Sequence, residues 1–356
     1  MSRSLHSPPV ANVPFSRPGT PGLRPTHVAF VGLGSIGYLM ARNLAINRHT
    51  HPAGNPPLLV WNRTAAKSEA LVKEVGANRA IVAASLEQVV NESDIIITCL
   101  ADDDVVKAIY EQFAKLIISA PSKKRIFVES STIFPTLAGE LDSLISSAPH
   151  AHLLTCPVFG AHSVAATAQL LILMSGDYHS KKEVAYLLVP AVGRKVIDLG
   201  ENIEKAPTLK LLGNSLILGT IEVLAEAQTL GEKSGIEGKT LHEVVQEILP
   251  APGVIAYSQK MINDDFDGTK GFALDGGIKD ASHIRRLTAK HNSPMPVIDI
   301  AHQHLITTRA IHSSLHQEGQ ASHDVLDWSG IVAASRVSAG LDAFDRKKVS
   351  ATASGC

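Results

Sequence analysis

Three glycines near the start of the chain have the spacing of a loop that binds phosphate groups. Gly32, Gly34 and Gly37 follow an apolar run, HVAFV, and precede a helical stretch that begins SIGYLMARNLA. In this context the first glycine permits a tight turn, the second lets the backbone approach a pyrophosphate, and the third lets helix and strand pack closely. The helix start also offers free N–H groups to an anion. The sequence therefore predicts a dinucleotide-binding loop made of Gly32, Leu33, Gly34, Ser35, Ile36 and Gly37.

The residues after the second apolar run indicate which dinucleotide is bound. The run LLVW is followed by Asn62, Arg63 and Thr64, with no carboxylate. An enzyme that binds NAD places Asp or Glu here to accept hydrogen bonds from the ribose 2′-hydroxyl, whereas a guanidinium binds a 2′-phosphate. These residues therefore predict NADP as the cofactor. The alternative is that Arg63 is a solvated surface arginine.

A lysine and an asparagine lie one helical turn apart in an apolar segment. Lys210 and Asn214 occur in LKLLGNSLILG, so they share a face of a helix. Burying a lysine among apolar residues is unfavourable unless its charge has a partner or a role. Beside a nicotinamide ring, Lys210 would exchange the proton that accompanies hydride transfer, and Asn214 would orient a substrate hydroxyl or carbonyl. The alternative is a surface lysine whose stem packs on the helix.

The pattern of apolar runs predicts an α/β Rossmann-type N-terminal domain. Between residues 27 and 200, short apolar runs alternate with helical patterns, which is typical of parallel strands joined by crossover helices. Thr64 is expected to cap a helix that Gly76 ends, and Ser85 to begin another. The expected strands are 27–31, 58–61, 94–100, 125–130, 152–158, 170–175 and 195–200.

After residue 200 the strand pattern disappears, which predicts an all-α C-terminal domain. A helix of about thirty residues is expected to start near Pro207 and to end near Gly235, with a length of about 45 Å that would join the two domains. Further helices are expected up to about residue 344. The predicted organisation is a disordered tail over 1–26, an NADP-binding domain over 27–200, the helical domain over 201–344 and a second tail over 345–356.

Composition is typical of a soluble globular enzyme. The 356 residues are 45% hydrophobic and 19% charged, with a formal net charge of −1. No strong field attracts nucleic acid, and no uninterrupted apolar run predicts a membrane span. Histidine pairs such as His312 and His316 lack further ligands, so no metal site is predicted.

The cysteines and the N-terminal tail indicate in which cellular compartment the protein is located. Three cysteines, two of them in apolar runs, argue against a disulfide framework and favour a reducing compartment. The tail over 1–26 contains arginines and no acidic residue, as mitochondrial transit peptides do, but its prolines oppose the helix that such a signal needs. A cytoplasmic location is therefore predicted, with a mitochondrial one as the alternative.

Six segments occur in the order that is found in one enzyme family. They are VGLGSIGYLMARNL, the strand end NRT, ESSTIFP, TCPVFGAHSVA, LKLLGN and GIKDA. Residues 27–330 therefore resemble the β-hydroxyacid dehydrogenases, which include 3-hydroxyisobutyrate dehydrogenase and reductases of glyoxylate or succinic semialdehyde, within the superfamily of 6-phosphogluconate dehydrogenase NADP-binding domains. The resemblance implies a Rossmann-type domain, a long linking helix, an all-helical second domain and a homodimer or higher homo-oligomer.

The resemblance also implies roles for individual residues. Lys210 would act as general acid/base with Asn214 one turn on, and Lys279 and Asp280 would form a pair near the cofactor. The other contacts that it implies are with the nicotinamide ribose through Leu100 and Ala101, with the nicotinamide region through the small polar pair Ser131 and Thr132, and an apolar cover over the substrate through Phe272.

One segment departs from the family's pattern. Members usually have Pro-Val-Ser-Gly-Gly where this chain has Phe159, Gly160 and Ala161 after the same Pro-Val. In the family the serine and the glycines contact a substrate carboxylate, whereas a phenyl ring donates no hydrogen bond and adds bulk. The departure predicts weakened or relocated carboxylate recognition and a more apolar substrate.

Together these observations predict an NADP(H)-dependent oxidoreductase that interconverts a small hydroxy acid or alcohol and the matching semialdehyde or carbonyl. Imine reductases and reductive aminases are one alternative, because they share the architecture and the Asn-Arg-Thr strand end, although they typically lack a lysine at the position of Lys210. A scaffold that binds NADPH without catalysis is the other alternative. The intact lysine–asparagine and lysine–aspartate pairs disfavour it.

Overall fold

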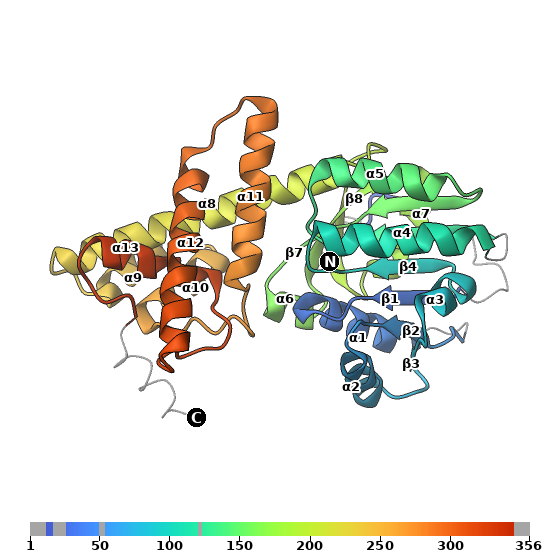
Figure 1. Cartoon of the computed structure of the whole chain (residues 1–356), viewed down its shortest axis with the longest axis horizontal. Helices are drawn as coiled ribbons and strands as arrows, with labels where there is room; N and C mark the ends of the chain where they lie inside the picture. Colours follow the sequence, from blue (N-terminus) through green and yellow to red (C-terminus); the bar gives the residue numbers. More distant parts are fainter. Residues whose placement is uncertain (1–11, 17–25, 50–53, 120–122, 345–356) are drawn as a thin grey trace, which may run out of the picture. The chain divides into compact units, whose positions relative to one another are not determined.

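The chain folds into two compact units, Met1–Lys210 and Leu211–Cys356. The computed structural model describes residues 12–16, 26–49, 54–119 and 123–344. The first unit is an α/β domain and the second is helical, as the sequence predicts (Figure 1). The division between them falls inside the long helix, later in the chain than the boundary expected at residue 200.

Six parallel strands form the larger part of the sheet in the first unit. Their spatial order is β3-β2-β1-β4-β5-β6, so the order reverses beside β1, which is where doubly wound folds bind ligands. The loops after β1, β2, β4 and β5 therefore leave from one edge of the sheet. The strands are β1 (Val28–Val31), β2 (Leu58–Trp61), β3 (Ala80–Val82), β4 (Ile95–Thr98), β5 (Arg125–Glu129) and β6 (Ala151–Thr155).

Three further strands extend the sheet in mixed directions. β8 (Leu170–Gly176) pairs antiparallel with β6 and with β7 (Val158–Phe159), and parallel with β9 (Gly193–Asp198). All the expected strands are present, and the prediction of a mostly parallel sheet is confirmed. β3 was not expected, because a strand of three residues is too short to show an alternating pattern, and the single strand expected over 152–158 is divided into β6 and the two-residue β7.

Helices cover both faces of the sheet because its strands divide their side chains between two apolar cores. Phe30 and Val31, consecutive in β1, lie in different cores. The core on one face includes residues of α1, α2 and α7, and the core on the other includes residues of α3, α4 and α5. These helices are α1 (Ser35–His49), α2 (Ala65–Val75), α3 (Leu86–Glu92), α4 (Asp103–Ser119), α5 (Pro135–Ser146) and α7 (Tyr178–Leu188), and the short α6 (His162–Ala166) lies between β7 and β8 in the chain.

The predicted signals at helix ends are confirmed in part. Ser85 caps α3 by accepting a hydrogen bond from the Gln88 N–H, and Gly76 ends α2 with a φ of 96°. Thr64 occupies the N-cap position of α2, but its side chain makes no capping hydrogen bond, so that predicted cap is wrong. The Thr64 side chain is instead exposed beside the end of β2.

Part of the expected N-terminal tail packs against the first unit. Val13 and Phe15 are 8% and 6% exposed and belong to the same core as α1 and α7. The Asn12 carbonyl accepts a hydrogen bond from the Val196 N–H of β9. The packing of residues 12–16 differs from the disorder that the sequence predicts for them; the rest of the predicted tail up to residue 25 lies outside the described residues.

The second unit is helical and begins within α8 (Lys205–Lys233). The 29 residues of α8 confirm the predicted long helix. Two isolated bridges, Asp267 with Leu326 and Ala273 with Asp327, join the segment before α11 to the segment before η1. The other elements are α9 (Gly238–Ile248), α10 (Pro252–Asn263), α11 (Leu274–His291), α12 (Pro296–Gln317), η1 (Trp328–Ile331) and α13 (Val332–Ser338).

By length and composition alone, α8 meets the criterion for a membrane-spanning helix. Its most apolar window of 18 residues has a mean hydropathy of 1.3, and 44% of that window is buried. Core helices of soluble proteins meet the same criterion, so it does not distinguish the two. The predicted lack of a membrane partner stays a prediction.

Candidate active site

Two glycines of the predicted phosphate loop lie in tight backbone contacts. A Cβ at Gly32, whose φ is +97°, would lie 2.3 Å from the Cys99 carbonyl oxygen. A Cβ at Gly37 would lie 2.3 Å from the Gly32 carbonyl oxygen. No side chain tolerates such distances, so the turn after β1 and the start of α1 can pack in this way only as glycines.

Gly34 borders open space where a dinucleotide phosphate would approach. Apart from its chain neighbours, no described atom lies within 4 Å of the position of a Cβ at Gly34, and both Gly34 and Ser35 are exposed at the start of α1. Leu33 is buried and Ile36 half-buried, so they contribute packing and backbone. An open backbone cradle at the N-terminus of a 15-residue helix fits a pyrophosphate, because free N–H groups and the helix dipole attract the anion.

Asn62 connects the end of β2 to the glycine loop. Its Oδ1 accepts a hydrogen bond from the Leu33 N–H at 2.8 Å, and its Nδ2 donates to the Thr64 carbonyl at 3.1 Å. Arg63 is exposed between them and forms no hydrogen bond or ion pair with any described residue. The structure therefore brings the three predicted ribose-recognition residues to the loop and leaves the guanidinium accessible to an anion.

A hydrogen bond joins the ends of β4 and β5. The Leu100 N–H donates to Ser131 Oγ at 2.7 Å. Ala101 is exposed next to Leu100, and Thr132 is half-buried next to Ser131. These four residues, all predicted to lie near the nicotinamide, are thus brought to the same edge of the sheet as the glycine loop.

A buried carboxyl, which the sequence did not lead us to expect, contacts the backbone of Ser131. Glu129, 1% exposed at the end of β5, accepts hydrogen bonds from the Ser131 N–H at 2.5 Å and from Thr98 Oγ1 at 2.6 Å. Burial raises the pKa of the Glu129 carboxyl, and the hydrogen bonds from Ser131 and Thr98 oppose the rise. Glu129 thus holds the turn that carries Ser131. A carboxylate directly after an apolar run, RIFVE, is the signal that would have found it.

Lys210 lies against Phe159 within the first unit. The Lys210 Nζ is 4.3 Å from the centre of the Phe159 ring, which is within the range of a cation–π interaction. Phe159 belongs to β7 and Lys210 to the second turn of α8, and both residues are half-buried. The predicted general acid/base and a predicted substrate residue are therefore in contact.

The turn after Phe159 depends on a glycine. Gly160 has a φ of +145°, and a Cβ there would lie 2.6 Å from Leu170 Cδ2 and 2.8 Å from Val164 Cγ1. Ala161 follows as the exposed N-cap residue of α6 and makes no side-chain cap. The predicted substrate segment 159–161 is thus a tightly packed turn whose own side chains donate no hydrogen bond.

Three more predicted residues meet in the second unit. Asn214 Nδ2 donates to Asp280 Oδ2 at 2.6 Å, and Lys279 Nζ forms an ion pair with Asp280 Oδ1 at 3.2 Å. Asn214 and Asp280 are 4% and 1% exposed. Because a buried carboxylate needs such partners, Asp280 fixes the orientation of Asn214, which follows Lys210 by one turn of α8.

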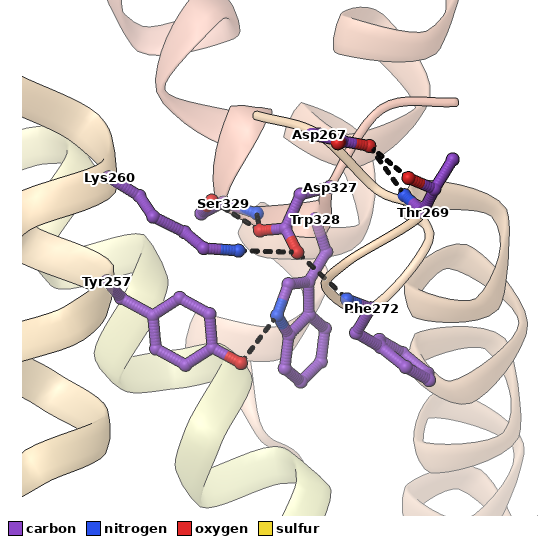
Figure 2. Close-up of polar contacts among 8 residues, drawn as sticks. All are labelled: Tyr257, Lys260, Asp267, Thr269, Phe272, Asp327, Trp328 and Ser329. Carbon is purple, nitrogen blue, oxygen red and sulfur yellow. Dashed lines mark hydrogen bonds and ion pairs between the residues drawn. The ribbon is translucent and has the colours of Figure 1, made fainter. Parts of the chain in front are cut away.

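Phe272 is held by a buried aspartate that the sequence analysis missed. Asp327, fully buried, accepts a hydrogen bond from the Phe272 N–H at 2.8 Å and forms an ion pair with Lys260 at 3.1 Å (Figure 2). The Phe272 ring meets the Trp328 ring edge-on, with centres 4.7 Å apart. Trp328 Nε1 donates in turn to the Tyr257 hydroxyl at 2.9 Å (Figure 2). Backbone and ring of Phe272 are therefore both fixed, while its role as a substrate cover stays a prediction.

Among the described residues, no group of three or more His, Cys, Asp or Glu side chains is arranged to hold a metal ion. The rings of His312 and His316 are 6.0 Å apart, and His312 Nε2 makes a hydrogen bond with the His323 carbonyl at 2.8 Å. One nitrogen of this pair is therefore already engaged within the second unit.

Comparisons with known proteins give a consistent result. Residues 27–200 match the model of the NAD binding domain of 6-phosphogluconate dehydrogenase, and residues 205–324 match that of the NAD-binding region of NADP-dependent 3-hydroxyisobutyrate dehydrogenase. The NADH-dependent oxidoreductase ucdB of Aspergillus ustus is 31% identical over 271 residues, which is 76% of this chain and 88% of the relative.

Solved structures show the same two-domain fold. Mycobacterium tuberculosis 3-hydroxyisobutyrate dehydrogenase with L-serine is 25% identical, with a TM-score of 0.68 over 87% of this chain and 98% of that one. A reductive aminase from Aspergillus terreus in complex with NADPH is 19% identical, with a TM-score of 0.52 over 87% and 99% of the two chains. The second likeness concerns the fold alone.

The substitution Glu129→Gln tests the buried carboxyl. The pKa of Glu129 is raised in the folded chain, so its contribution to stability is complete below the ordinary value of 4.5 and is lost as the pH rises through the raised pKa. Glutamine can still accept from the Ser131 N–H and donate to Thr98, without a charge. We expect the free energy of unfolding of the variant, compared with that of the parent, to increase as the pH rises above the ordinary value of 4.5 toward the raised pKa, because only the parent has a buried carboxyl to ionise.

Urea unfolding measured over this pH range gives that difference. Glu140→Gln is the matched control, because the Glu140 side chain is 58% exposed and pairs only at the surface with Lys107. If the free energies of unfolding of Glu129→Gln and the parent differed by the same amount at every pH, the pKa of Glu129 would not be raised in the folded chain.

Proposed function

We propose that this chain is an NADP(H)-dependent enzyme, because it belongs to the β-hydroxyacid dehydrogenase family of NAD(P)-binding oxidoreductases. It interconverts a small hydroxy acid or alcohol and the matching semialdehyde or carbonyl. One observation carries the proposal: Lys210 Nζ lies 4.3 Å from the Phe159 ring, in the same unit as the open glycine loop and the Leu100–Ser131 contact.

In the proposed reaction Lys210 moves the proton. A bound nicotinamide cofactor supplies or takes up the hydride at the substrate carbon. In the direction of reduction, the Lys210 ammonium donates a proton to the carbonyl oxygen, which becomes a hydroxyl; in the direction of oxidation, the neutral amine removes that proton. Asn214, held by Asp280, orients the substrate oxygen one helical turn from Lys210.

Residues at the end of β2 support NADP as the preferred cofactor. Asn62 anchors this strand end to the glycine loop, and the exposed guanidinium of Arg63 follows it, near the N-terminus of α2. A planar guanidinium binds a phosphate through two hydrogen bonds, and the N–H groups of a helix start add to the attraction. The relative from Aspergillus ustus is named for NADH, so cofactor preference is a property to measure in this chain.

An apolar stripe on α8 supports the proposed homo-oligomer. Leu216, Val223 and Leu230 follow each other at intervals of seven residues on one helix face and are 73%, 57% and 68% exposed. Three large apolar side chains in line on one helix are unfavourable in water and are typical of a helix that packs on another helix. A second copy of the same stripe is the proposed partner.

Lys210→Ala tests the assigned acid/base. We expect turnover to fall by about 10²–10⁴-fold, because the variant has no group to exchange the proton, while NADPH affinity stays within a factor of about two. Steady-state rates and NADPH fluorescence titration measure the two effects. Lys205→Ala, an exposed lysine on the first turn of the same helix, is the control. Near-normal turnover of Lys210→Ala would show that Lys210 is not the general acid/base.

The same assay separates the alternative functions. A panel of semialdehydes and cyclic imines with NADPH distinguishes a carbonyl reductase from an imine reductase. Tight NADPH binding with no turnover on either class would favour the non-catalytic scaffold.

Arg63→Ala tests the cofactor preference. We expect the parent to bind NADPH ahead of NADH, and the variant to lose about 10–100-fold in NADPH affinity with little change for NADH, because only the 2′-phosphate loses a charged hydrogen bond. Arg63→Asp should abolish or reverse the preference. Lys73→Ala, which removes an exposed charge from the other end of α2, is the control. Equal affinities of the parent for the two cofactors would refute the proposal.

Replacing Val223 and Leu230 by lysine tests the stripe on α8. We expect light scattering to give a multiple of the 37.8 kDa chain mass for the parent and a smaller assembly for the double variant, because two charges on each copy would be buried without partners. Glu232→Lys, an exposed position on the opposite side of the helix, is the control. An unchanged assembly in the double variant would exclude this surface as the interface.

A further inference from the structure

We propose that Phe159 determines the substrate class by closing the space beside Lys210 to a carboxylate and favouring carbonyl compounds whose neighbouring substituent is uncharged and apolar. The inference rests on the proposed function, because it assumes that Lys210 is the group that exchanges the proton. It assigns to Phe159 two effects on the same site: the ring positions the lysine ammonium, and the ring selects the substrate.

The first effect follows from the contact itself. The Lys210 Nζ lies 4.3 Å from the ring centre of Phe159, and the negative face of an aromatic ring attracts a cation at this distance. A lysine side chain has many rotamers, and one such contact reduces their number. Phe159 is therefore a positioning residue for Lys210.

The backbone that carries Phe159 is fixed by its neighbours, so the ring can leave Lys210 only by a change of rotamer. Phe159 pairs with Leu171 of β8 in an antiparallel register, and the Pro157 carbonyl accepts a hydrogen bond from the Leu173 N–H at 3.0 Å. On the other side, the Gly160 backbone packs so closely on Leu170 that a Cβ would lie 2.6 Å from its Cδ2. The strand and the turn thus fix the backbone on both sides of Phe159.

The second effect follows from the chemistry of the same segment. Residues 158–161 are Val, Phe, Gly and Ala, so no side chain in this stretch donates a hydrogen bond or carries a charge. A carboxylate placed against the Phe159 ring would lose water without gaining a donor from these side chains. An alkyl or aryl group in the same place would gain contact with the ring. The segment therefore favours an uncharged substituent next to the reacting carbonyl.

Matched pairs of substrates isolate the charge. Succinic semialdehyde and its methyl ester, and glyoxylate and its methyl ester, differ mainly in the charge of one group. With saturating NADPH, we expect the parent to have a kcat/KM for each ester about ten-fold or more above that for the acid. A parent that uses the acids ahead of the esters would overturn the inference without any variant.

Variants of Phe159 separate selection from positioning. Phe159→Ser adds a donor and removes the ring, so we expect the ester-to-acid ratio to fall by about ten-fold or more, mainly through a lower KM for the acids. Phe159→Leu keeps apolar bulk without an aromatic face, so we expect the ratio to persist while kcat falls for both substrates. Phe159→Tyr keeps the aromatic ring, so we expect its kcat to stay near that of the parent, in contrast to Phe159→Leu.

Controls keep the outcomes distinct. Tyr178→Leu removes an aromatic ring that is 44% exposed elsewhere in the first unit and should change neither kcat nor the ratio. An unchanged ratio in Phe159→Ser, with Lys210→Ala inactive, would overturn this inference and leave the proposed function standing. Full turnover of the esters by Lys210→Ala would overturn the proposed function itself.

Discussion

The closeness of two backbones at the glycine turn is the constraint on which the rest of the first unit depends. The turn after β1 passes within contact distance of the Cys99 carbonyl at the end of β4, and the start of α1 rests on the turn itself. Any Cβ at Gly32 or Gly37 would separate these segments. Because β1 lies between β2 and β4, that separation would also disturb the Asn62 and Leu100 contacts, which hold the neighbouring strand ends. Cofactor recognition and sheet packing therefore rest on the same short distances.

Lys210 occupies a special place because it ends the first unit while its helix continues into the second. Its side chain contacts Phe159 on β7, whereas Asn214, one turn later, is tied to Asp280 on α11. A single helix thus carries one residue held by the sheet domain and one held by the helical domain.

Local patterns in the sequence were sufficient for most of the fold and for much of the candidate site. Short stretches of sequence are enough to recognise an apolar strand, the glycine spacing or a long apolar helix. The structure contains the strands, the glycine turn and the long helix α8 that these patterns predict. What was missed depends on contacts between distant residues. Asp327 looks like an ordinary carboxylate in the sequence, and the place of Glu129 after an apolar run does not show what it contacts; only the fold brings these two carboxyls to Ser131 and Phe272. Thr64 has the right type for a cap, yet its side chain makes no capping bond.

The short segment at residues 12–16 has a consequence for the edge of the sheet. β9 pairs with β8 on one side, and on its other side the Val196 N–H is taken by the Asn12 carbonyl, while Val13 and Phe15 enter the core. An uncovered strand edge offers its N–H and C=O groups to any other extended chain and so promotes aggregation. Because the N-terminal segment covers part of that edge, it opposes β-strand addition by neighbouring molecules. Tags or truncations that displace it would therefore reduce solubility before they affect the chemistry.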